Sequence, residues 1–207
     1  MLAQAEKTQD LRVRRTRMMI QKAFTELLEE KGFQSITIQE IANRAMVNRA
    51  TFYDHFADKY ALLEQVMHEW FRQVLEQKLP ADFSYCIGNL QFLIATVCEF
   101  LEQIDTHCGL LDRHVFPAHE KQITSMVSEI LLKWLQSPEK KIHVSSPELT
   151  ADVVSWAIYG TAFHWNQNNP QTESATDFAT RATPLITAIL KPAAIKTMLK
   201  AQSDDSL

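Results

Sequence analysis

The side chains best suited to binding chemistry in this chain lie in one short stretch, residues 48–51. The Arg49 guanidinium can donate two hydrogen bonds to a guanine edge, and Thr51 can contact a thymine methyl group or a phosphate. Polar groups that can reach phosphate oxygens follow at Tyr53, His55 and Lys59. The residues at the tip, where bases would be read, are Asn48, Arg49, Ala50 and Thr51.

Catalytic or metal chemistry finds little support. The chain has no Gly-rich phosphate loop, no nucleophile elbow and no carboxylate pair with an evident acid–base role, so we expect no enzyme and no cofactor. His107, Cys108, His114 and His119 lie close in sequence, but no pair has the i, i+3 or i, i+4 spacing that places two ligands on one helical face. We therefore expect no metal site.

The charge distribution and the cysteines indicate which region contacts a partner and in which compartment the protein acts. Residues 1–60 carry ten Lys/Arg against eight Asp/Glu, whereas the remainder carries eleven against seventeen. This asymmetry fits a nucleic-acid contact confined to the N-terminal part. Three cysteines without CxxC spacing read as free thiols of a reducing compartment. The start lacks an apolar stretch, and the run 92–98 is too short to span a bilayer, so we expect a cytoplasmic protein without membrane contact.

Helical spacing dominates the elements that must position these groups. An apolar face begins after Thr16 and ends at Gly32, which we expect to be a left-handed C-terminal residue with Leu28 and Phe33 in contact across it. Thr37 and Glu40 form a capping box that opens a second helix. Asn48 is a good N-cap for a third, short helix to about residue 55.

The rest of the chain reads as six more helices. The patterns place them at about 58–77, 84–104, 110–115, 118–135, 147–166 and 173–190. The fold class is therefore all-α with about nine helices, in which a three-helix helix-turn-helix DNA-binding domain (10–58) precedes a larger helical ligand-binding and dimerisation domain (59–191) and a tail (192–207).

Two short helices joined by a turn of about three residues suggest a helix-turn-helix, although such a pair can also be a simple helical hairpin. Here the sequence also resembles a known family. The run AFTELLEEKGFQSITIQEIANRAMVNRATFYDHFADKYALL looks like the DNA-binding domain of the TetR family of bacterial regulators, over about residues 14–63. One departure is Met46, which stands in the turn where the family pattern usually has Gly.

The resemblance implies particular contacts with double-stranded operator DNA. It implies that Gln39, Arg49, Ala50 and Thr51 face bases, and that Thr37, Tyr53, His55 and Lys59 hold phosphates. It also implies an inducer site between helices of the larger domain. Candidate lining residues there are Trp70, Phe92, Thr96, Phe100, His107, His114, Trp134 and Tyr159.

The last two long helices form the expected homodimer interface, although the same spacing also fits an intramolecular contact. The family analogy favours a two-fold four-helix bundle, which would hold two recognition helices roughly 34–36 Å apart or more. Its candidate residues are Val153, Trp156, Gly160, His164, Phe178, Leu185 and Ile189.

These features favour a dimeric repressor that an apolar or aromatic small molecule releases from DNA. The alternative is a coactivator or adaptor that dimerises with another regulator and contacts DNA only secondarily.

Overall fold

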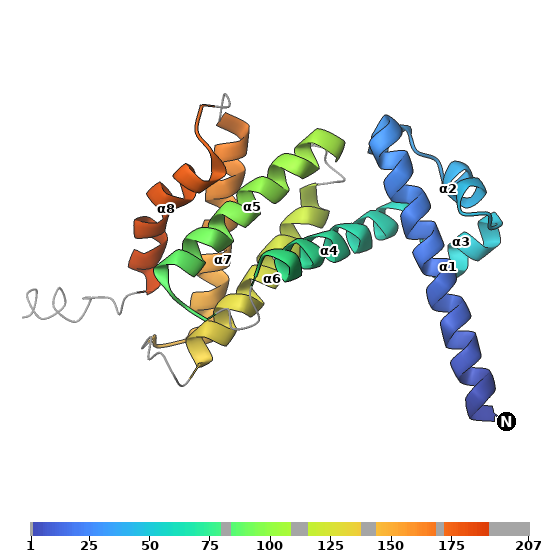
Figure 1. Ribbon diagram of the computed structural model, residues 1–207, viewed down its shortest axis with the longest axis horizontal. Coiled ribbons are helices and arrows are strands. Elements are labelled where there is room, and N and C mark those ends of the chain that lie inside the picture. Colours follow the sequence, from blue (N-terminus) through green and yellow to red (C-terminus); the bar gives the residue numbers. More distant parts are fainter. Residues whose placement is uncertain (1, 80–83, 109–115, 138–143, 169–171, 191–207) are drawn as a thin grey trace, which may run out of the picture. The chain divides into compact units, whose positions relative to one another are not determined.

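The structure, a computed structural model, describes residues 2–79, 84–108, 116–137, 144–168 and 172–190. Within these ranges it holds eight α-helices and one short 3₁₀-helix (Figure 1), which confirms the all-α fold class. The expected helix at 110–115 and the tail at 192–207 lie outside the described residues. In chain order the elements are α1 (Leu2–Lys31), η1 (Phe33–Ser35), α2 (Ile38–Arg44), α3 (Arg49–His55), α4 (Lys59–Lys78), α5 (Ile87–Cys108), α6 (Phe116–Gln136), α7 (Pro147–Asn168) and α8 (Ala175–Leu190).

The helices gather into two compact units. The first comprises Met1–Gln73 and Glu102–Gln122, and the second comprises Val74–Leu101 and Ile123–Leu207. The first unit therefore contains most of α4 in addition to residues 10–58, the DNA-binding domain predicted from the sequence. Three of the long helices, α4, α5 and α6, contribute residues to both units.

The first unit forms around a core of fully buried aromatic and aliphatic side chains. Helix α2 packs on both α1 and α3, and Ile20 and Phe24 of α1, Ile41 of α2 and Phe52 of α3 are all completely buried. Burying such a side chain stabilises the fold by roughly 1.5–3 kcal/mol. The expected apolar faces of these three helices thus meet in one core.

Helix α1 ends at Gly32 through a backbone geometry that favours glycine. The Gly32 amide donates to the Leu28 carbonyl at 3.1 Å, as in a left-handed helix terminus. Its φ is 71°, as expected, but its ψ of 160° is extended rather than left-handed helical. That combination is open essentially to glycine alone. It turns the chain so that Phe33 is buried edge-on against Phe24.

In the second unit, α7 and α8 pack against each other. The rings of Trp165 and Phe178 stack 5.7 Å apart, and Phe178 is only 7% exposed. The expectation that Phe178 lies on an intermolecular surface is therefore wrong, because its side of α8 faces α7 within the same chain. Among the described helices, none has both the length and the apolar character needed to cross a bilayer.

Candidate nucleic-acid interface

The start of α2 is fixed by the capping box that the sequence predicts. The Glu40 amide donates to the Thr37 hydroxyl at 3.3 Å, and the Thr37 amide donates to the Glu40 carboxylate at 2.9 Å. The Thr37 hydroxyl donates to the same carboxylate at 2.7 Å. These bonds satisfy polar backbone groups that the first turn of a helix leaves open.

The turn between α2 and α3 is set by the residue that departs from the family pattern. Met46 has a φ of 54°, the left-handed region, and it is 84% exposed. The Val47 amide donates to the Ala42 carbonyl at 2.9 Å, and the Met46 amide donates to the Asn43 carbonyl at 3.1 Å. This pair of bonds is a Schellman motif. The turn therefore keeps the geometry that glycine would favour, with a methionine in the strained position.

Helix α3 presents its first turn to solvent. The Asn48 side chain accepts from the Thr51 amide at 2.7 Å, which confirms Asn48 as the N-cap. Arg49 and Ala50 are exposed, and Thr51 is half-buried. Arg49 donates to the Tyr53 hydroxyl at 3.3 Å and lies 6.0 Å from the centre of that ring. The guanidinium is thus held at the open end of α3, with a planar set of donors facing outward.

Helix α2 adds polar groups to the exposed side of the same motif. Gln39 is exposed and donates to the Asn43 side chain, one turn further along, at 2.8 Å. Asn43 was not among the site residues predicted from the sequence, although its i, i+4 spacing from Gln39 indicates such a pair. This pairing orients the amide of Gln39, a group able to read an adenine edge.

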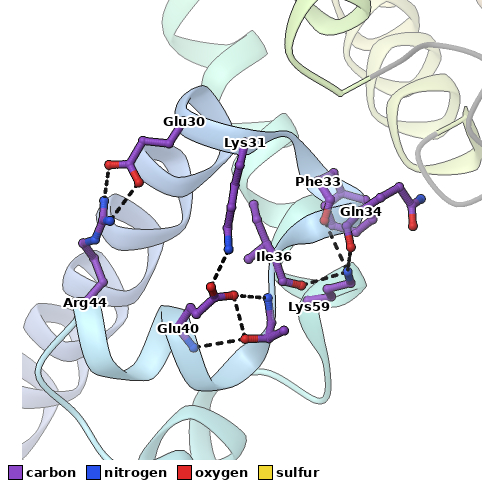
Figure 2. A network of polar contacts seen from close by, with 9 residues as sticks. Glu30, Lys31, Phe33, Gln34, Ile36, Glu40, Arg44 and Lys59 are labelled. Carbon is purple, nitrogen blue, oxygen red and sulfur yellow. Dashed lines mark hydrogen bonds and ion pairs between the residues drawn. The ribbon is translucent and has the colours of Figure 1, made fainter.

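Lys59 makes contacts that its position in the sequence does not predict. Its Nζ donates to the carbonyls of Ile36 at 3.0 Å, Phe33 at 3.2 Å and Gln34 at 3.4 Å, as Figure 2 shows. The same group lies 4.6 Å from the centre of the Phe33 ring. An ammonium group has three N–H donors, so these three carbonyls can engage all of them. The Lys59 side chain thus anchors the α1–α2 connection to α4, and its assignment to a phosphate stays a prediction.

The carboxylate of Glu40 links this connection to the end of α1. Lys31 donates to it at 2.5 Å (Figure 2), and this bond, followed by those from Thr37, lowers the pKa of Glu40 to about 2. The negative charge lies at the N-terminus of α2, where the helix dipole favours it. A phosphate approaching Thr37 would compete with Glu40 for the same hydroxyl and amide.

A second ion pair ties the other end of α2 to α1. The Arg44 guanidinium donates to both oxygens of Glu30, at 2.6 and 2.8 Å (Figure 2). This bond lowers the pKa of Glu30 and raises that of Arg44. The two pairs, Lys31–Glu40 and Arg44–Glu30, hold the two ends of α2 against the last turn of α1. They therefore fix the position of α2, and with it that of Gln39, relative to α1.

The candidate ligand-binding residues fall in different places. Thr96, Phe100, Trp134 and Tyr159 are buried in the second unit, on α5, α6 and α7, whereas Phe92 on α5 is 39% exposed. Trp70 belongs to the first unit, where it lines a groove between α1 and α4. The side chains of His107 and His114 lie outside the described residues. Of the four metal-ligand candidates only His119 is described, and it is fully buried.

The expected interface residues of the last two helices are exposed, apart from Phe178. On α7, Val153 is 46% and Trp156 is 51% exposed, and Gly160 and His164 also face solvent. Leu185 and Ile189 on α8 are 71% and 39% exposed.

Comparison with known proteins finds a family similarity in the N-terminal region. Residues 20–66 match the tetR family of bacterial regulatory proteins. Over these residues the chain is similar to that family, and residues 20–66 are named the TetR-family domain. The match spans the second half of α1, both helices of the helix-turn-helix and the first turns of α4, so the TetR-family domain contains every base-reading candidate.

A relative of the TetR-family domain is YxbF of Bacillus subtilis (strain 168), described as an uncharacterized HTH-type transcriptional regulator. It is 40% identical over 84 residues, which are 38% of this chain and 22% of YxbF. The chain thus aligns with about a fifth of that relative's length.

Solved structures extend the likeness in fold to nearly the whole chain. RolR, determined in complex with resorcinol, has a TM-score of 0.57 at 16% identity, covering 90% of this chain and 92% of RolR. NalD of Pseudomonas aeruginosa, the secondary repressor of the MexAB-OprM multidrug efflux pump, has a TM-score of 0.50 at 21% identity, covering 84% of this chain and 96% of NalD. The likeness in fold therefore extends beyond the TetR-family domain into the helices that follow it.

Proposed function

We propose that this protein is a dimeric repressor that binds operator DNA through α3 and leaves it when a small aromatic molecule binds the helices of the second unit. The observation that carries the proposal is the exposed first turn of α3, capped by Asn48 and presenting Arg49 and Ala50, within the TetR-family domain. An exposed helix start of this kind is what enters the major groove in helix-turn-helix proteins.

The proposed DNA contacts divide into two classes. Gln39, Asn48, Arg49, Ala50 and Thr51 read base edges, and Thr37, Tyr53 and His55 hold phosphates. Tyr53 is 47% exposed and accepts a hydrogen bond from Arg49, one helical turn away. Its side chain can therefore contact a DNA phosphate and also orient the Arg49 guanidinium. Lys59 ranks below these three as a phosphate contact, because its Nζ already donates to the carbonyls of Phe33, Gln34 and Ile36.

Operator binding is tested by fluorescence anisotropy with DNA from the upstream region of the protein's own gene. Arg49→Ala should lower the affinity for that DNA by about 1–3 kcal/mol, because alanine cannot donate the two hydrogen bonds to guanine. Lys133→Ala is the matched control, since Lys133 is an exposed cation on α6 of the second unit. A folded dimer without sequence-specific binding at low salt contradicts the proposal. If Arg49→Ala and Tyr53→Ala both leave regulation of the adjacent gene unchanged, the coactivator alternative is favoured over the repressor.

The proposed dimer uses the exposed stripe of α7 and α8. Val153, Trp156 and Gly160 follow one face of α7, and Leu185 and Ile189 are exposed on α8. Joined into one surface, these exposed apolar side chains would form the kind of patch that marks an interaction site. A two-fold dimer through this stripe would present two copies of α3 to a near-palindromic operator.

The proposed ligand is a small aromatic molecule bound among the helices that carry Thr96, Phe100, Trp134 and Tyr159. These helices bring together several rings and a buried hydroxyl, the mixture usual in small-molecule sites. Because RolR was solved with resorcinol, resorcinol is a suitable first probe. Binding should raise the melting temperature and release the DNA, and Phe100→Ala should weaken both effects. Release of DNA without any effect of Phe100→Ala would place the ligand elsewhere.

A further inference from the structure

We propose that the N-terminal part of α1 is a second DNA-binding element, in which Arg12, Arg14 and Arg15 hold phosphates beside the site read by α3. The inference rests on the proposed function, and it concerns a surface that the helix-turn-helix does not include. The partner is the sugar-phosphate backbone of duplex DNA.

The charged residues in the part of α1 from Leu11 to Lys22 are all cationic. This stretch carries five cationic residues and no acidic residue. Arg12, Arg14 and Arg15 are all exposed, and no ion pair involves them within the described part of the chain. Other cations of the first unit do have acidic partners, as in Arg44–Glu30 and Lys31–Glu40. Three unmatched guanidinium groups on one helical turn attract a polyanion.

The fold also accounts for why this turn is available. Ile20 is the first residue of α1 that the structure shows as buried, and every residue from Leu11 to Arg15 is exposed. The helix therefore continues past the core of the unit, and Figure 1 shows α1 running on beyond α2 and α3 toward its N-terminus. From Leu11 to Arg15, therefore, no side chain contributes to the buried core of the unit.

Arg17 marks the point at which the helix is held by the rest of the unit. It donates to the Gln65 side chain of α4 at 2.5 and 3.0 Å and lies 5.1 Å from the centre of the Phe56 ring. Arg17 thus serves the fold, whereas the three arginines before it do not. From Ile20 to Arg12 a helix rises about 12 Å, a distance equal to roughly three to four base pairs. The extension is long enough to reach phosphates outside the base pairs that α3 reads.

The salt dependence of binding to a random-sequence duplex of about 30 base pairs, roughly three turns, tests this element. In Arg12→Gln/Arg14→Gln/Arg15→Gln, the slope of log affinity against log salt should become shallower by about 0.9 for each phosphate that the variant no longer neutralises, or about 2.7 per protomer. The charge-matched control replaces the exposed cations Lys78, Lys121 and Lys133, all outside the Leu11–Lys22 segment, by Gln and should keep the wild-type slope. Circular dichroism should show both variants folded, since none of the six residues is buried.

The outcomes separate this inference from the proposed function. A triple-arginine variant that keeps the full wild-type slope overturns the inference while operator recognition stands. A wild-type protein that binds no duplex at low salt overturns both. The triple variant should lose affinity equally for operator and random DNA, whereas Arg49→Ala should lose it for the operator alone. Loss confined to the operator would show that the three arginines read sequence and would overturn the phosphate assignment.

Discussion

The Lys59 ammonium group donates to the Ile36 carbonyl at 3.0 Å, across 23 residues of sequence. With the carbonyls of Phe33 and Gln34 it holds the whole η1 connection against the first turn of α4. This connection precedes the capping box of α2, so Lys59 fixes where the helix-turn-helix begins relative to α4.

Replacing Lys59 by Met should therefore reduce stability by about 2 kcal/mol, because methionine cannot donate the charged hydrogen bonds that the three carbonyls accept. Urea denaturation measures this change. A phosphate-binding role alone would instead lower DNA affinity and leave the urea midpoint unchanged. The Lys22→Met variant, on the exposed face of α1, should leave both quantities near their wild-type values.

Met46→Gly should stabilise the protein by about 0.5–1 kcal/mol. A left-handed φ costs an L-residue roughly 1–2 kcal/mol, and the extra freedom of glycine in the unfolded chain removes only part of that gain. Because Met46 is 84% exposed, its side chain contributes little packing. Met46→Ala separates the two effects, since alanine keeps the backbone cost and should not stabilise. An equal gain in both variants would show that the side chain, and not the backbone angle, is unfavourable.

The local features of the helix-turn-helix could be read from the sequence because they depend on neighbouring residues. The Thr37–Glu40 capping box and the Asn48 cap are set by spacings of three residues, and both occur. The Arg44–Glu30 pair joins residues fourteen apart, and its partners cannot be chosen until α1 and α2 are packed. The carbonyl contacts of Lys59 could not be predicted, because backbone carbonyls are acceptors that any sequence supplies. The spacing of Phe178 along α8 fits either a contact within the chain or a contact with a partner. Its stacking on Trp165 shows that it packs within the chain.

The low pKa of Glu40 predicts a particular pH dependence. Its folded-state pKa of about 2 lies below the ordinary value of 4.5, so the unfolded chain binds more protons between these values. The stabilisation is thus fully present above pH 4.5 and is lost as the pH falls toward 2. Glu40→Gln keeps a side chain suited to the capping box but removes the charge that Lys31 binds.

Thermal denaturation between pH 2 and pH 6 compares the two proteins directly. The difference in stability between wild type and Glu40→Gln should be largest above pH 4.5 and should shrink as the solution is acidified. Other carboxylates with lowered pKa values, such as Glu30 and Glu173, titrate in both proteins and cancel in the comparison. A difference that stays constant across this range would contradict the role of the Glu40 charge.

The exposed stripe of α7 and α8 predicts the effect of a single charge on assembly. Leu185 is 71% exposed on α8, and if it lies in the proposed dimer interface, Leu185→Glu would bury an unpaired carboxylate there. Sedimentation velocity should then show a monomer where the wild type is a dimer. Ile87→Glu is the matched control, because Ile87 is an exposed aliphatic residue on α5 of the same unit, outside the stripe. The monomer should also lose affinity for a two-half-site operator but keep that for a single half-site, since each copy of α3 is unchanged. A Leu185→Glu protein that remains dimeric would place the interface elsewhere.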